Sequence, residues 1–289
     1  MQIVTDSGTD LNLTPEEQAA LNIHVVPLVV TLDNVSYQEN VDIDGATFYR
    51  LLAATDTLPV TSQPSAGVFA DLYRTLAKTD PDILSIHISS GLSGTVNSAL
   101  TAASMVDEAQ VTVIDAKTLS AASGWQVEAA ARAAQAGWPL ERIQSLVADI
   151  SDAADSLYTL KELKYLIHGG RISHMKGLVA SLLNIKPIIG VEKEGGTYVQ
   201  KGQARAFGGA VKGLVTMMTR QYAPGTALRT QVLHSNDPEA GEMLRDQVDR
   251  TFDCDWLPLK PMSLVLGAHT GPGMVGVAYA PREIFAEIP

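Results

Sequence analysis

The chain has 289 residues, 46% of them hydrophobic, and a formal net charge of −11. This length and composition suffice for one large or two ordinary folded domains and exclude a disordered chain. The acidic balance excludes a general nucleic-acid surface, and a single cysteine, Cys254, excludes an internal disulfide and a multi-cysteine zinc site. Because the sequence has neither a membrane-spanning apolar run nor a signal-like segment, we expect a cytoplasmic protein.

Strands and helices alternate through the first half of the chain. The predicted elements are strands over 2–5, 23–32, 83–88 and 111–114, and helices beginning near Pro15, Gly45, Thr95, Ser120 and Leu140. This alternation predicts βαβ units around a parallel sheet. Pro27 favours an edge or a bulge in the second strand, and Thr61 and Ser62 lie in a stiff loop between two prolines that can present both hydroxyls inward.

The apolar run over 83–88 stops in a turn rich in hydroxyls and glycines and then becomes a helix. Ligands of open α/β sheets bind at the carboxyl ends of the strands, and helix N-termini attract anions. We therefore expect a carboxylate or phosphate near Ser93 and Gly94. Ser93 can also be a helix cap or a nucleophile, but the hydrolase elbow needs a glycine where Thr95 stands.

The second half mixes hairpins with helices, which suggests an α+β domain. Its predicted elements are helices over about 160–167, 177–185, 210–222 and after Asp237, and strands over 186–191, 197–203, 230–233, 255–259, 263–266 and 274–280. The predicted fold class is thus α/β, with an N-terminal parallel-sheet (Rossmann-like) domain over 1–155 and a C-terminal α+β domain over 156–289.

Four further side chains in this half are candidates for binding. His269 lies in a glycine-rich turn predicted between two apolar strands, where it can donate to a carboxylate or be a satisfied loop histidine. Arg171, Lys201 and Arg205 can each hold a helix end, bind phosphate or simply be solvated. The six histidines lack the spacing of metal ligands, so we expect no metal site.

Six segments together resemble the DegV family of bacterial fatty-acid-binding proteins, and they follow the family's order along nearly the whole chain. They are residues 5–11 (TDSGTDL), 61–65 (TSQPS), 89–95 (SSGLSGT), 169–173 (GGRIS), 185–188 (IKPI) and 269–273 (HTGPG). The first segment departs from the usual family pattern at Gly8, and the match around 201–205 is loose.

This resemblance implies a carrier without independent catalysis that buries a long-chain fatty acid near the domain junction. It implies carboxylate contacts from Thr61, Ser62, Ser93, Gly94 and His269, with Arg171 and Arg205 serving phosphoryl transfer or partner docking. The implied partners are an ATP-dependent fatty acid kinase subunit, which brings ATP and Mg²⁺, a transiently contacted membrane surface and an acyltransferase. The chain itself has no GxxxxGK[ST] loop and no kinase signature, and we expect no intrinsic cofactor.

Two other functions remain open from the residues. A serine esterase or acyl-phosphate hydrolase would use Ser93 as nucleophile and His269 as base, although no orienting acid is evident in the sequence. A phosphometabolite-binding protein would use the same helix N-terminus for a phosphate group.

Overall fold

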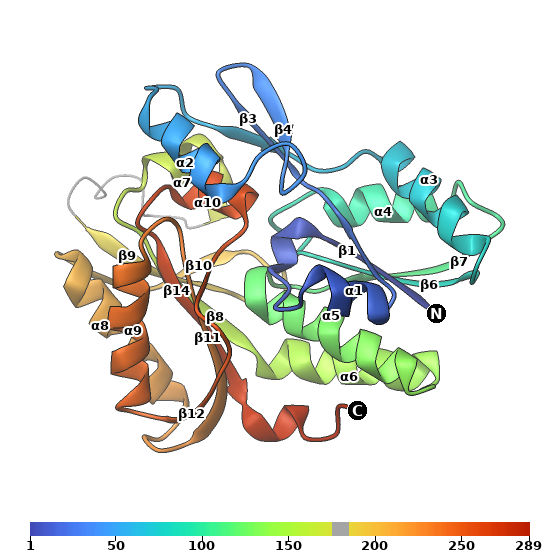
Figure 1. The fold of residues 1–289 in the computed structure, drawn as a ribbon. Helices are drawn as coiled ribbons and strands as arrows, with labels where there is room; N and C mark the ends of the chain where they lie inside the picture. Colours follow the sequence, from blue (N-terminus) through green and yellow to red (C-terminus); the bar gives the residue numbers. More distant parts are fainter. Residues whose placement is uncertain (175–184) are drawn as a thin grey trace.

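The computed structural model describes residues 1–174 and 185–289, whose strands form three sheets (Figure 1). The helix predicted over 177–185 therefore lies outside the described residues except for Ile185. None of the helices in these two ranges is long and apolar enough to cross a bilayer.

The first sheet is parallel, as predicted. Its order is β2 (Ile23–Val26), β1 (Gln2–Asp6), β6 (Asp82–His87) and β7 (Gln110–Asp115). Helices α3 (Ala66–Ala77) and α4 (Thr95–Ala103) cover one face, and α1 (Pro15–Ala20) and α5 (Ser120–Gln135) lie on the other (Figure 1). Thr14 and Glu17 form the predicted capping box of α1.

The second sheet is mixed. Its order is β10 (Tyr198–Ala204), β9 (Lys186–Val191), β8 (Asp155–Thr159), β14 (Val275–Pro281), β11 (Ala227–His234) and β12 (Asp253–Trp256), with β13 (Lys260–Pro261) also paired to β11. Helices α8 (Phe207–Gln221) and α9 (Pro238–Asp249) pack on one face and build a separate core with it. The opposite face joins a larger core that also contains α5, α6 (Leu140–Ala153) and residues of the first sheet.

A small antiparallel sheet consists of β4 (Val35–Gln38), β3 (Val29–Leu32) and β5 (Val60–Ser62), and α2 (Gly45–Ala53) lies between β4 and β5 in the sequence. The single strand predicted over 23–32 is wrong, because the chain leaves the first sheet at Val26 and begins an antiparallel strand at Val29. Pro27 has no N–H for a ladder, which suits this break. The 59–65 loop, in turn, contains a short strand that pairs with β3.

The segment before His269 also differs from its prediction. The strand predicted over 263–266 is instead the start of helix α10 (Leu264–Thr270), which ends at Gly271 with a positive φ of 70°. The apolar run is too short for its periodicity to separate a helix from a buried strand. The predicted strand over 255–259 is displaced into β12 and β13, and the central strand β8 was not predicted at all.

The two larger sheets divide along the sequence. All strands of the first sheet precede Ala116, and all strands of the second follow Ala154. A domain boundary near residue 155 agrees with this division and stays a prediction, because α5 and α6 contact strands of the second sheet as well. The short helix α7 (Lys164–His168) and α10 lie together at the carboxyl-end side of β6 (Figure 1).

Candidate functional site

A narrow cavity of about 30 Å³ lies where the end of β6, the strand β5, helix α10 and the start of β10 meet. It brings together segments that are far apart in the sequence. Its lining residues are Leu28, Thr61, Ser62, Gln63, Ile88, Leu92, Ser93, Leu119, Arg171, Tyr198, Val265, Leu266 and His269.

Five of the seven residues predicted for the site therefore line one cavity: Thr61, Ser62, Ser93, Arg171 and His269. The other two lie elsewhere. Gly94 is next to the cavity at the start of α4, where an added Cβ would lie 2.8 Å from the Gln63 side chain. Arg205 is exposed beyond the end of β10 and is not a lining residue.

His269 is held in the last turn of α10, with only 7% of its surface exposed. Its Nε2 lies 2.7 Å from the Thr61 hydroxyl, and its Nδ1 is buried with no hydrogen-bond partner among the described residues. Burial, reinforced by the positive charge of Arg171, lowers the pKa of His269 to about 4. The imidazole is therefore neutral at pH 7 and offers one N–H donor.

The imidazole also explains the glycine at position 169. A Cβ added there would lie 2.0 Å from Nδ1 of His269, so the backbone after α7 can approach the ring only without a side chain.

Arg171 ties two sides of the cavity together. Its Nε donates to the Leu92 carbonyl at 3.1 Å, and its Nη1 donates to the Gly169 carbonyl at 2.7 Å. Its Nη2 makes no hydrogen bond to the described residues, so this edge of the guanidinium can serve an anion.

The turn that contains Ser93 is fixed from outside by the β9–β10 hairpin. A Cβ on Gly91 would lie 2.2 Å from the Gly195 carbonyl, and one on Gly196 would lie 1.9 Å from the Ser89 hydroxyl. The glycines on both sides therefore permit a close approach of two backbones. The Ser93 hydroxyl is 2.8 Å from that of Thr95 and accepts weakly from the Thr95 N–H at 3.3 Å.

Ser93 and His269 do not form the nucleophile–base pair of the esterase alternative, because each is hydrogen-bonded to a threonine instead. An Asp–His–Ser arrangement does occur elsewhere: His87 contacts Asp6 at 2.9 Å and Ser85 at 2.7 Å. Ser85 also contacts Tyr73 at 2.8 Å. All four side chains are completely buried and Ser85 lines none of the cavities described here, so this chain of hydrogen bonds is structural.

An apolar path continues from the cavity between the two sheets. A second small cavity shares Leu119 and Tyr198 with the first. Its other lining residues are Tyr158, Leu160, Leu166, Ile189, Met262 and Thr270. The hydroxyls and His269 therefore lie beside a mostly hydrophobic part of the interior, where the second cavity holds only about 10 Å³.

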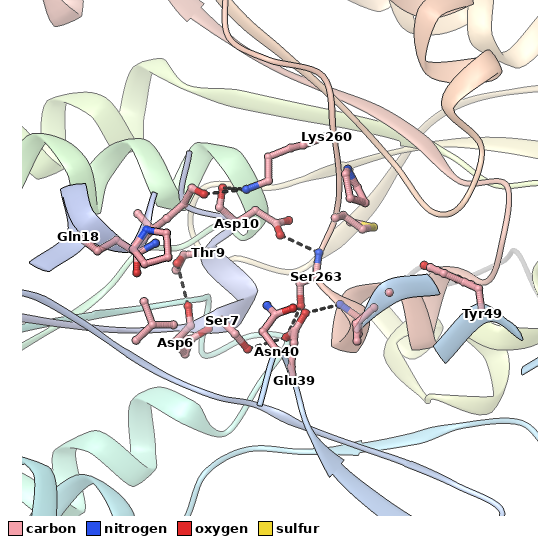
Figure 2. Close-up of a pocket in the computed structure, with 17 residues that line it drawn as sticks. Asp6, Ser7, Thr9, Asp10, Gln18, Glu39, Asn40, Tyr49, Lys260 and Ser263 are labelled. Carbon is pink, nitrogen blue, oxygen red and sulfur yellow. Dashed lines mark hydrogen bonds between the residues drawn. The ribbon is translucent and has the colours of Figure 1, made fainter. Parts of the chain in front are cut away.

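A larger cavity of about 470 Å³ lies at the other end of α10 (Figure 2). Two buried carboxylates that we had not predicted as functional, Asp10 and Glu39, border it. Glu39 accepts from the Ser7 hydroxyl at 2.6 Å, from the Ser263 hydroxyl at 2.8 Å and from the Leu264 N–H. Asp10 accepts from the Ser263 N–H at 2.7 Å and from the Ser120 hydroxyl at 2.5 Å.

Burial raises the pKa of Asp10 to about 6 and that of Glu39 to about 7. Asp10 belongs to the 5–11 segment that carries the family resemblance, so the sequence held a signal for it. The sequence held no such signal for Glu39, because its partners Ser263 and Leu264 lie more than 220 residues away along the chain.

Comparison with known proteins places these observations in a family. Residues 1–282 match the family described as "Uncharacterised protein, DegV family". The chain is 35% identical over 280 residues to a DegV domain-containing protein of Deinococcus radiodurans, covering 96% of this chain and 95% of that one.

Solved structures agree with this match. A DegV family protein from Thermus thermophilus, described as binding fatty acid, has 28% identity and a TM-score of 0.86, covering 97% of this chain and 99% of that one. DegV from Bacillus subtilis, described as a fatty acid binding protein, gives the same identity, TM-score and coverage.

Proposed function

This chain belongs to the DegV family, and from this premise we propose that it is a carrier of long-chain fatty acids. The observation that supports this most is the cavity between β5, the Ser93 turn and α10. It gathers three hydroxyls, a neutral histidine and an arginine edge at the end of an apolar path. The fatty-acid binding described for the Thermus thermophilus and Bacillus subtilis relatives agrees with this chemistry.

The head group of the ligand is a carboxylate in this proposal. An ionised carboxylate leaves water only when protein donors satisfy both of its oxygens. Thr61, Ser62 and Ser93 supply hydroxyl donors, and Arg171 supplies the remaining edge of its guanidinium. His269 acts through Thr61: its pKa of about 4 keeps the imidazole uncharged at pH 7, and when its Nε2–H donates to the Thr61 oxygen, the Thr61 hydroxyl remains free to donate to the carboxylate.

The tail lies along the apolar path in this proposal. About 14 methylenes of a C16 acid, at about 0.8 kcal/mol each, supply roughly 11 kcal/mol of gross burial energy, enough to offset much of the association cost. The two cavities along the path hold about 30 and 10 Å³. Their lining side chains must therefore move apart to admit the chain.

We further propose that this protein presents the bound carboxylate to an ATP-dependent fatty acid kinase subunit. A carboxylate oxygen would attack the γ-phosphorus of ATP, giving an acyl phosphate and ADP, with ATP and Mg²⁺ supplied by that partner. Arg171 at the cavity and Arg205 on the surface would serve this step or the docking of the kinase. Transient membrane contact would load the acid, and an acyltransferase would accept the product.

The binding function is tested by extracting the purified protein with organic solvent and identifying released lipid by mass spectrometry. We expect long-chain fatty acid to be released, and we expect added hexadecanoic acid to raise the melting temperature of delipidated protein. Absence of both results contradicts the proposal. Stabilisation by phosphorylated metabolites alone would favour phosphate binding, and ester turnover that disappears in Ser93→Ala would favour the hydrolase.

The kinase role needs its own experiment. A DegV-dependent kinase subunit, ATP, Mg²⁺ and hexadecanoic acid are incubated with and without this protein, and acyl phosphate is trapped as a hydroxamate with hydroxylamine. We expect hydroxamate only when this protein is present. Equal yields with and without it would contradict presentation to the kinase while leaving fatty-acid binding intact.

A further inference from the structure

The first turn of α10 is held by carboxylates from the opposite end of the chain (Figure 2). Glu39 follows β4, and Asp10 follows the first turn after β1. Together they accept hydrogen bonds from the N–H groups of Ser263 and Leu264 and from the Ser263 hydroxyl. The start of the helix is thereby fastened to the N-terminal part of the molecule.

These carboxylates are already fully engaged within the protein. Both oxygens of Asp10 and both oxygens of Glu39 accept hydrogen bonds from protein donors. Lys260, the cation nearest to them, donates to the Leu11 carbonyl at 2.7 Å. Each of these oxygens thus already accepts a hydrogen bond from the protein, and the geometry indicates that the two side chains hold the helix.

The other end of the same helix carries His269. It follows Leu264 by five residues, a rise of about 7.5 Å along the helix axis. The helix has only seven residues, and backbone hydrogen bonds link its first turn to its last, so a shift of the first turn would displace His269. The contact of 2.7 Å between His269 and Thr61 is lost after a shift of about 1 Å, because hydrogen bonds weaken beyond ordinary distances.

We propose that Glu39 and Asp10 are positioning residues that hold His269, through the first turn of α10, in register with Thr61 for recognition of the fatty-acid carboxylate. This inference rests on the proposed fatty-acid binding and adds to it a determinant at the far end of the helix. Neither carboxylate lines the cavity that contains Thr61, Ser93 and His269, so neither would contact the head group of the ligand.

The test compares two ligands that share a tail: hexadecanoic acid, which needs His269, and hexadecan-1-ol, which lacks the carboxylate. Glu39→Ala leaves the Leu264 N–H without its acceptor, and we expect acid affinity to fall at least about tenfold, as for the loss of a hydrogen bond to a charged group. We expect alcohol affinity to change less than about twofold, because tail burial is unaltered.

Glu39→Gln keeps the size and shape of the side chain, and this variant is used for the test if Glu39→Ala fails to fold. Removal of a negative charge by itself would strengthen binding of an anion, so weaker acid binding by this variant supports positioning, and stronger binding overturns it. Asp80→Asn is the matched control, since Asp80 accepts from the Asp82 N–H at 3.0 Å just before β6, and neither residue lines either cavity. We expect this control to keep the wild-type ratio of acid to alcohol affinity.

A second readout separates this inference from the proposed function. Imidazole nitrogen shifts of His269, recorded by NMR on ligand-free protein, should change in both Glu39 variants and stay fixed in Asp80→Asn. Unchanged shifts together with an unchanged acid-to-alcohol ratio overturn the positioning role, even if the protein binds fatty acid. If the wild type binds neither ligand, the proposed function fails, and the shifts alone decide the positioning role.

Discussion

The stability of the protein should depend on pH through Glu39, and Glu39→Gln should remove that dependence. Burial raises the pKa of this carboxyl from 4.5 to about 7, and the neighbouring negative charge of Asp10 acts in the same direction. The hydrogen bonds from Ser7, Ser263 and Leu264 oppose the rise but are outweighed by burial. The titratable groups around it are Asp6, Asp10, Tyr49 and Lys260, with His87 behind Asp6.

The sign of the effect is opposite to that of most carboxylates in folded proteins, whose pKa is depressed. Because the pKa of Glu39 is higher in the folded state, its contribution to the free energy of unfolding is fully present below pH 4.5 and is lost as the pH rises through about 7. The rise of about 2.5 units corresponds to about 3 kcal/mol at 1.36 kcal/mol per unit. Asp10, raised from 3.8 to about 6, adds a contribution of the same sign at lower pH.

Urea unfolding at pH 5, 6, 7 and 8 measures how the contribution of Glu39 to the free energy of unfolding changes with pH. We expect the unfolding free energy of Glu39→Gln, relative to wild type, to increase by about 2 kcal/mol between pH 5 and pH 8. Asp44→Asn is the control for pH dependence: hydrogen bonds from Thr47 hold the pKa of the exposed Asp44 carboxyl below its usual 3.8, so its contribution to stability changes only at more acidic pH. Parallel curves for wild type and Glu39→Gln over this range would refute the reasoning.

Four further substitutions test the site and its support. Gly91→Ala should destabilise the protein and weaken fatty-acid binding, because the added Cβ would lie 2.2 Å from the Gly195 carbonyl oxygen. Gly208→Ala, where the added Cβ meets open space on α8, should instead raise the free energy of unfolding in urea by about 0.5–1 kcal/mol. His269→Phe should lower hexadecanoic-acid affinity at least about tenfold with alcohol affinity unchanged, as measured by calorimetry; an equal loss of both would contradict a head-group role. Tyr73→Phe should cost about 1 kcal/mol of stability by removing one of the two hydrogen-bond partners of Ser85, with ligand affinity unchanged; a loss of affinity would contradict its structural role.

Local patterns predicted the first half of the fold well. The strand over 83–88, the helix beginning at Thr95 and the capping box at Thr14 all follow from apolar periodicity and capping chemistry within a short window. The hairpin β3–β4 was missed although Asp33 and Asn34, both with positive φ, form its two-residue turn. The long apolar segment around Pro27 concealed the change from one sheet to another.

The site was predicted in its parts, and the family resemblance supplied the link between them. No pattern within 59–65 or 267–273 says that Thr61 will lie 2.7 Å from His269, because these residues are separated by 208 positions. The strand predicted before His269 was wrong for a related reason. A buried run of three apolar residues fits a helix or a strand equally, and the carboxylates that hold its N–H groups lie in another part of the chain.

The cost of burying Glu39 supports the idea that this side chain serves the site. A buried ionised carboxyl with a raised pKa lowers stability at neutral pH, and apolar residues of similar volume often pack a core at least as stably. The charge is nevertheless placed against the first turn of the one helix that carries His269, with both oxygens occupied by donors from two distant segments. Departures from the most stable packing concentrate at functional positions. If the charge had no role in the site, Glu39→Gln would gain stability at pH 8 without weakening acid binding. Weaker acid binding by that variant would therefore support a role in the site.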